Sequence, residues 1–176
     1  MTWRIVSNLI TDLAIDAHPT TLPGGVNLGD ICIAKDSDTG DTAEFLCLQG
    51  CASTLYGNLV EWDGDYLTTR VVANATSDTD PGHNVAAAMA ATVALEYGWY
   101  MIRGRHPAIV KGTLVATGVN LFTSSVAGAV QAATVSGRYI MGIKSASSVN
   151  STSTTNDTVA AVLTYPRINP KGGTPA

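Results

Sequence analysis

The chain has 176 residues, enough for one ordinary domain with a single hydrophobic core and too few for most multidomain enzymes. Only 14% of the residues are charged, while a hydrophobic fraction of 45% supplies enough apolar surface to fold, so the composition excludes intrinsic disorder. The formal net charge of −4, with only 10 lysine and arginine residues, argues against nucleic-acid binding, because phosphate neutralisation needs clustered basic side chains.

Residues 1–27 contain two prolines and the pair Gly24-Gly25, a pattern that predicts an irregular N-terminal arm rather than a core element. Such an arm is suited to reaching a neighbouring subunit. Asp12 and Asp16 break the basic-then-apolar order of a secretion signal, so we expect no export signal.

Two hairpins are predicted after the arm. The apolar runs 31–34 and 43–48 flank a polar turn at 36–41, which is a hairpin signature. The runs 58–62 and 66–73 are joined by an Asp-Gly-Asp turn, whose residues tolerate positive φ.

The alanine-rich run 85–93 follows a polar linker at 74–84. Alanine is the best helix former, so propensity alone favours a helix over 85–93. The run is short, however, and it precedes a loop at 95–97 and a strongly strand-like segment at 98–104. A strand is therefore predicted, with a helix as the alternative.

Further strands recur at the spacing expected of all-β sandwiches and barrels; they are predicted at 108–110, 120–123, 129–132, 139–145 and 158–165. The last strand is apolar on both faces, so both faces are expected to be covered, and Pro166 is expected to end it.

The predicted organisation is all-β. It comprises an N-terminal arm (1–27), one β-rich domain (28–168) and a short flexible C-terminal tail (169–176). The Ser/Thr/Asn-rich tract Ser147–Asp157 should form an exposed mobile loop. The long uncharged run from Gly112 to Gly137 is interrupted by glycines and polar residues at strand-and-turn intervals, so we expect no membrane span.

The three cysteines, Cys32, Cys47 and Cys51, cannot all pair within one chain. An odd count fits reduced thiols better than a disulfide framework, and buried small hydrophobes are the simplest interpretation.

Residues that would carry catalysis or bind metal are sparse. The turn Asp36–Asp41 has alternating carboxylates, but its glycine is misplaced for a calcium loop, which favours a solvated turn. No catalytic motif or paired histidine spacing is present, and His83 and His106 are expected at the surface beside prolines. We therefore expect a protein that is not an enzyme, with no metal and no cofactor.

Tryptophans and arginines are the remaining prominent side chains. They dominate interface hot spots, although strand tryptophans also commonly lie in cores. Trp3 is expected at an interface because it lies on the arm. For Trp62 and Trp99 the sequence allows either a core position or an interface position. The arginines are expected to be solvated or paired with a partner's carboxylates. The candidate interface residues are Trp3, Arg4, Trp62, Trp99, Arg103, Arg105 and Arg167.

From Gly29 to Ile168 the order of features resembles a family of tailed-bacteriophage head decoration, or cement, proteins. The segments that carry the resemblance are Leu28–Asp30, Tyr97–Gly104, Lys111–Val130, Ile140–Ile143 and Val159–Arg167. The Tyr-Gly-Trp strand and the closing strand ending in Pro-Arg are the most specific. The N-terminal arm and the alanine run depart from the family pattern.

The resemblance implies a compact β-barrel or β-tulip-like protein on the outer surface of an expanded capsid, assembled in the host bacterial cytoplasm. Reduced thiols fit assembly in that compartment. Its partners would be the major capsid protein and itself, as a homotrimer. A virion surface binding module, such as a head fibre base or an adhesion domain for host glycans, is the alternative, with Ser147–Asp157 as its contact loop. An uncharacterised hydrolase is a third hypothesis.

Overall fold

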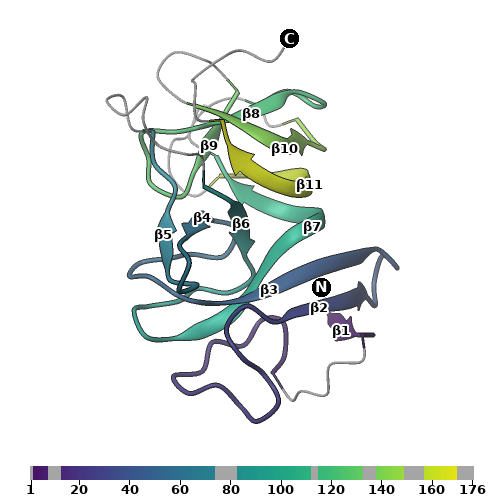
Figure 1. The fold of residues 1–176 in the computed structure, drawn as a ribbon. Coiled ribbons are helices and arrows are strands. Elements are labelled where there is room, and N and C mark those ends of the chain that lie inside the picture. Colours follow the sequence, from purple (N-terminus) through teal and green to yellow (C-terminus); the bar gives the residue numbers. More distant parts are fainter. Residues whose placement is uncertain are drawn as a thin grey trace.

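The computed structural model describes residues 2–7, 13–73, 83–111, 115–132, 138–148 and 157–169. These residues contain strands, turns and loops but no helix, so the predicted all-β class is confirmed (Figure 1). The strands of the described residues are β1 (Trp3–Ile5), β2 (Ile31–Asp36), β3 (Thr42–Gln49), β4 (Leu59–Trp62), β5 (Thr68–Arg70), β6 (Val85–Ala88), β7 (Tyr97–Val110), β8 (Asn120–Thr123), β9 (Val130–Gln131), β10 (Tyr139–Ser145) and β11 (Thr158–Ile168).

The long strand β7 is where the sheet branches. One edge of β7 pairs with β3, while the other edge pairs first with β6 and then with β11, all antiparallel. Strands β4 and β5 continue from β6, and β10, β8 and β9 continue from β11 (Figure 1). Strands β2 and β1 extend the sheet on the β3 side.

Alternating side chains of the central strands belong to two hydrophobic clusters, one on each face of the sheet. Trp99 and Met101 of β7 join Phe45 of β3 in the main core. Tyr100 and Ile102, which point to the opposite face, join a smaller second cluster. The second cluster also contains Leu46, Leu48, Val60, Ala86 and Ala88. Residues 45–48 of β3 and 98–102 of β7 are therefore buried on both faces.

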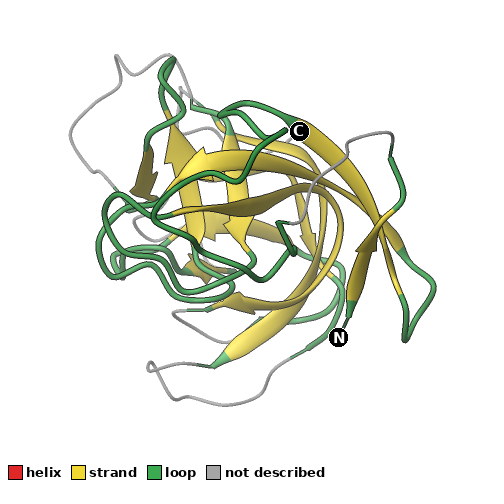
Figure 2. Ribbon diagram, turned by 90° about the horizontal axis from the view of Figure 1, so that it is seen from below, coloured by secondary structure: helices red, strands yellow, loops and turns green. Residues whose placement is uncertain are grey.

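The sheet curves strongly around the main core (Figure 2). Its terminal strands, β1 and β9, do not pair with each other, so the sheet is not closed into a barrel. The predicted β-barrel is thus replaced by an open, curved antiparallel sheet.

Both predicted hairpins are confirmed, as the antiparallel pairs β2–β3 and β4–β5. The alanine-rich run begins as strand β6, which confirms the strand over the helix there. Its small side chains suit this position, because Val85 and Ala87 pack in the main core while Ala86 and Ala88 pack in the second cluster.

The described part of residues 1–27 does not project from the domain. Strand β1 pairs with β2, and Leu13, Ile15 and Val26 are buried in the main core. The prediction of an arm outside the core is therefore wrong for these residues. Their apolar side chains fill one end of the core, where the backbone oxygen of Leu13 accepts a hydrogen bond from Trp99 Nε1 at 3.2 Å.

Two predictions about the last strand are also wrong. Strand β11 continues past Pro166 to Ile168, because a bulge opposite Gly142 places the proline where the β10–β11 ladder is interrupted. Only one face of β11 is covered: Val159, Ala161 and Leu163 lie in the core, whereas Val162 on the other face is 44% exposed.

Most of the predicted 74–84 linker, the 147–157 loop and the C-terminal tail lies outside the described residues. Within the part of the chain that the structure describes, no helix is long and apolar enough to cross a membrane.

Gly57 provides a test of how the loop before β4 packs on β7. It has a φ of +81°, and an added Cβ would lie 1.8 Å from the Ala108 carbonyl oxygen. Gly57→Ala is expected to lower the free energy of unfolding by about 3 kcal/mol, since left-handed strain and a backbone clash combine. Gly24→Ala is the control, because Gly24 has open space around it. Equal denaturation midpoints for the two variants would contradict this packing.

Candidate interaction surface

The outer face is defined here as the side of β2, β3, β7 and β11 that points away from the main core. It carries several exposed apolar side chains on neighbouring strands, namely Ile31, Ile33, Val162 and Tyr165. A hollow of about 310 Å³ opens on this face. We call it the aromatic groove.

The aromatic groove has an aliphatic floor and aromatic walls. Leu46 and Ile102, both buried, lie at its base, and Trp62, Tyr66 and Tyr165 line its sides. Gly29, Ile31, Asn84, Val85 and Pro166 complete the lining. Such a surface offers few polar groups and a large area for apolar contact.

Tyr66 is held in the groove by its turn. Asp63 accepts backbone hydrogen bonds from Asp65 and Leu67, both at 3.0 Å, and Tyr66 takes a left-handed φ of 61°. The tyrosine ring lies over Gly29, where an added Cβ would be 2.4 Å from Tyr66 Cζ. A glycine at position 29 therefore leaves the space that this ring occupies.

Tyr165 is held from the other side by the bulge in β11. Its φ is 48°, and the opposing Gly142 of β10 has a φ of 76°. The Tyr165 hydroxyl donates a 2.5 Å hydrogen bond to Glu44 Oε2, while Arg103 donates to Glu44 Oε1 at 2.8 Å. Hydrogen bonding to Glu44 raises the pKa of both the Tyr165 hydroxyl and the Arg103 guanidinium.

The Glu44–Arg103–Tyr165 cluster separates two hollows on the outer face. The aromatic groove lies on its Tyr165 side. A second hollow of about 410 Å³, lined by Ile33, Glu44, Arg103 and Val162 among others, lies on its other side. The cluster therefore places a fixed charge pair between two partly apolar depressions.

The structure brings three of the predicted interface residues, Trp62, Arg103 and Arg105, to this surface. Trp62 lines the aromatic groove and Arg103 belongs to the charge cluster, although its carboxylate partner is Glu44 of the same chain rather than a partner's. Arg105 lies farther along β7 opposite Val162, and Arg167 follows the groove-lining Pro166 on β11.

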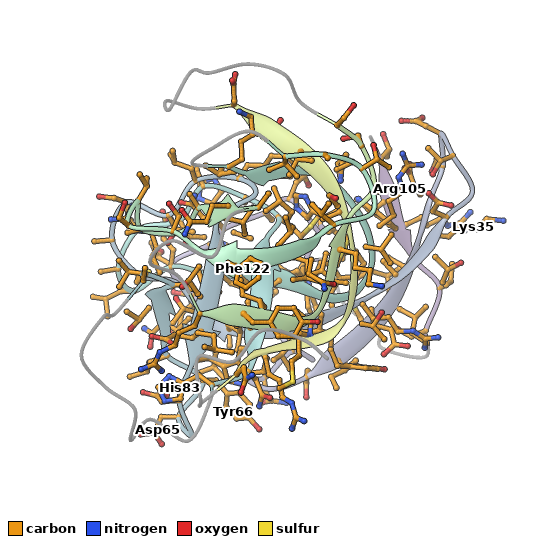
Figure 3. All side chains as sticks on the ribbon, turned by 90° about the horizontal axis from the view of Figure 1, so that it is seen from above. Lys35, Asp65, Tyr66, His83, Arg105 and Phe122 are labelled. Atoms are coloured by element: carbon orange, nitrogen blue, oxygen red, sulfur yellow. The ribbon has the colours of Figure 1, made fainter. Side chains whose placement is uncertain are left out.

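The other predicted interface residues lie elsewhere. Trp99 is 1% exposed and belongs to the main core, which removes it as a surface candidate. Trp3 is partly buried against Phe45, with ring centroids 5.1 Å apart. Arg4 is exposed on β1 directly opposite Lys35 of β2. Figure 3 shows Lys35 and Arg105 at the opposite end of the molecule from Tyr66 and His83.

The acidic turn after β2 is structural. Asp36 is buried, and its carboxylate accepts hydrogen bonds from the Asp38 amide and the Thr39 hydroxyl, each at 3.0 Å. Among the described residues, no group of three histidine, cysteine or carboxylate side chains is placed to hold a metal ion.

The prediction that His106 lies at the surface is wrong. His106 is buried in β7, where desolvation lowers its pKa to about 4. Its Nδ1 accepts the Ala108 amide at 3.2 Å, so Nε2 carries the proton and donates to the Ala88 carbonyl at 3.4 Å. His83 is partly exposed, as expected, and its Nδ1 lies 2.8 Å from Glu61 Oε2.

Two cysteines are confirmed as buried hydrophobes without disulfides. Cys32 and Cys47 lie in the main core, and burial raises the pKa of each thiol to about 12. Cys51 is partly exposed, with its Sγ 3.1 Å from Thr54 Oγ1.

Sequence reasoning missed Glu44, Tyr66 and Tyr165. Tyr66 directly follows the predicted Asp-Gly-Asp turn, and Tyr165 directly precedes Pro166, so turn and bulge signals were present beside both. The contact between Tyr165 and Glu44 joins strands that are distant in sequence, and no local pattern indicates it.

No protein-family model matches the chain, and no curated protein matches its sequence. The similarity to head decoration proteins therefore stays a prediction.

His106 should make the fold acid-sensitive. Because its pKa of about 4 lies below the unfolded value near 6.5, its neutral form supports folding fully above about pH 6.5. This contribution is lost as the pH falls toward 4, by about 3 kcal/mol in total. His106→Gln, which keeps a donor and an acceptor, should flatten this part of the pH profile of the free energy of unfolding. Parallel profiles for the two proteins would contradict the burial of a neutral imidazole.

Thiol labelling should separate the cysteines. A thiol-specific disulfide reagent at pH 8 is expected to modify Cys51 in the folded protein, and to modify Cys32 and Cys47 only after denaturation, because thiolates are the reactive form. Cys51→Ser should abolish the native-state reaction. Three thiols reacting at one rate would show that the core is open.

Proposed function

We propose that this chain is a structural virion protein that binds the outer surface of an expanded phage capsid and stabilises it by bridging neighbouring major capsid protein subunits. The observation that carries this proposal is the aromatic groove beside the Glu44–Arg103–Tyr165 cluster, on a sheet face with exposed apolar side chains. Tryptophan, tyrosine and arginine are the residues that most often supply binding energy at protein interfaces.

The scaffold suits a docking role. Leu46 of β3 and Ile102 of β7 belong to the second buried cluster, so the base of the groove is carried by a rigid part of the fold. Tyr66 and Tyr165 are held by contact with Gly29 and by the hydrogen bond to Glu44. A rigid surface binds with less loss of conformational entropy than a flexible one. In this proposal the protein also associates with itself as a homotrimer. A trimer would present three docking surfaces to the shell and so increase the avidity of binding.

Selective binding to the expanded shell is what would stabilise it. If the protein binds only this state, each occupied site contributes about 2.7 kcal/mol when the free protein is a hundredfold above its Kd. A standard interface buries roughly 800 Å² per partner, which the groove alone does not provide. The proposed interface therefore includes the second hollow and the exposed side chains Ile31, Ile33 and Val162.

Capsids assembled with and without the protein provide the test. We expect bound protein to raise the temperature or pressure at which expanded capsids rupture, and to add density on the shell surface. Trp62→Ala should weaken capsid binding by about tenfold or more. Val126→Ala is the matched control, because Val126 is an exposed apolar residue in the β8–β9 connection, away from the outer face.

Equal rupture thresholds and no added density would refute the proposal. Loss of host adsorption on removal of the protein, with unchanged capsid stability, would instead support the adhesion module.

A further inference from the structure

We propose that the free edge of β1 is a binding site for an extended, acidic segment of another polypeptide, which adds to the sheet as a further strand. The hollow beside this edge shares no lining residue with the aromatic groove, so the site is separate from the proposed capsid contact at that groove.

Strand β1 ends the sheet and leaves backbone groups without partners. It pairs with β2 on one side, and no described strand pairs with its other side (Figure 1). The Val6 amide donates to the Ile33 carbonyl of β2 at 2.8 Å. Because backbone groups alternate in direction along a strand, the amides and carbonyls of Trp3 and Ile5 point away from β2, and no described residue bonds to them. An added strand satisfies such groups in register.

Buried polar atoms of this edge also lack partners. Trp3 Nε1 and the Ser7 hydroxyl oxygen are buried, and no described residue forms a hydrogen bond with either atom. Both side chains lie on the inner side of the edge together with Ile5, because exposure alternates over residues 2–7. Buried polar atoms are rarely left unsatisfied in folded proteins. Their presence at a free edge indicates that a polar contact is missing there.

The outer side of the edge carries two positive charges that are not neutralised. Arg4 lies directly opposite Lys35 of β2, and both side chains are exposed. Neither forms an ion pair with a described carboxylate. Like charges in directly opposed positions repel each other across a sheet. A glutamate or aspartate on the added strand, opposite Arg4, relieves this repulsion, so the charge of the edge favours an acidic segment.

The carboxylates of the adjoining β2–β3 turn do not replace this missing charge. Asp36 is buried, and its carboxylate accepts hydrogen bonds within the turn. The exposed Asp38 and Asp41 form no ion pair with either basic side chain of the edge. Asp41 lines a different hollow, of about 210 Å³, together with Arg105.

The edge has room for the side chains of an added strand. A hollow of about 590 Å³ lies beside it, lined by Arg4, Ile5, Val6 and Lys35 among others. Val6 is 55% exposed on the same side as Arg4, so an apolar side chain two positions from the acidic one would pack against it. Figure 3 shows Lys35 at the opposite end of the molecule from Tyr66, which separates this site from the aromatic groove.

A second copy of this chain fits the edge poorly. In a two-fold antiparallel pair that satisfies both Trp3 and Ile5, each Trp3 pairs with Ile5 of the other copy, and Arg4 lies opposite Arg4. With Lys35 beside each arginine, four basic side chains would then lie in one row across the joined sheets. The occupant is therefore a different chain.

The test uses the full chain and the synthetic peptide acetyl-Ser-Val-Thr-Glu-Thr-Val-Ser-amide, whose sequence is the same in both directions. Hydrogen exchange of single amides, followed by NMR, is the measurement. The peptide should slow exchange at Trp3 and Ile5, whose amides point away from β2, and should leave exchange at Arg4 unchanged. The indole N–H resonance of Trp3 should shift over the same titration.

Two control peptides identify the interactions. Replacing the glutamate by lysine should weaken binding about tenfold, because attraction at the edge becomes repulsion. N-methylation of the three central residues removes their backbone donors and should abolish the protection. Added salt should weaken binding of the glutamate peptide, since the charges involved are exposed.

Exchange of the charge at the edge separates binding from folding. Arg4→Glu should reverse the preference, so that the lysine peptide binds about tenfold more tightly than the glutamate peptide. Its Tm should not fall, because glutamate opposite Lys35 is a favourable cross-strand pair. Lys144→Glu is the matched control and should keep the original preference. Lys144 is an exposed basic residue of β10, which β2, β3, β7 and β11 separate from β1 in the sheet.

Unchanged exchange at Trp3 and Ile5 in millimolar peptide would overturn the inference, as would equal binding of the glutamate and lysine peptides. Protection of these amides that grows with protein concentration, without peptide, would overturn it in favour of a second copy. Trp62→Ala should leave peptide binding unchanged, because Trp62 lines the aromatic groove and not this edge. Loss of peptide binding in that variant would instead place the peptide in the groove.

Discussion

Pairing of β7 on both edges, together with burial of both faces over residues 98–102, is the constraint on which the rest of the structure depends. The strand bonds to β3 along one edge and to β6 and β11 along the other. Its side chains alternate between two clusters, so a shift by one residue would exchange Trp99 and Met101 with Tyr100 and Ile102. This register determines which residues form the floor of the aromatic groove.

Irregularities in the ladder shape the outer face. The register between β3 and β7 shifts next to Glu44, and the shift places Arg103 opposite that carboxylate. A second irregularity between β10 and β11 turns Tyr165 toward the same carboxylate. Bulges re-aim side chains at the expense of a few ladder hydrogen bonds. The charge cluster is thus assembled by departures from regular pairing.

Local patterns were sufficient to predict the hairpins and the all-β class, because alternation and turn residues act over short distances. They were not sufficient to predict the environment of His106, whose burial requires Ala88 and Tyr56 from other segments. The burial of Leu13 and Ile15 likewise depends on tertiary contacts that form only in the folded chain. Trp62 was predicted as an interface candidate from its residue type alone. Tyr66 and Tyr165 reach the groove through left-handed backbone conformations, which are unfavourable for tyrosine and which no propensity scale predicts.

The position of the charge cluster bears on specificity. A partner that fills both hollows must cover Glu44 and Arg103, and removing a charge pair from water is unfavourable unless its remaining hydrogen-bonding capacity is met. Glu44 already accepts bonds from Arg103 and Tyr165, so its orientation is set before binding. A partner with a mismatched charge at this point would lose affinity even if its apolar contacts were good. The groove can therefore supply the apolar binding energy while the cluster discriminates among the surfaces that could cover it.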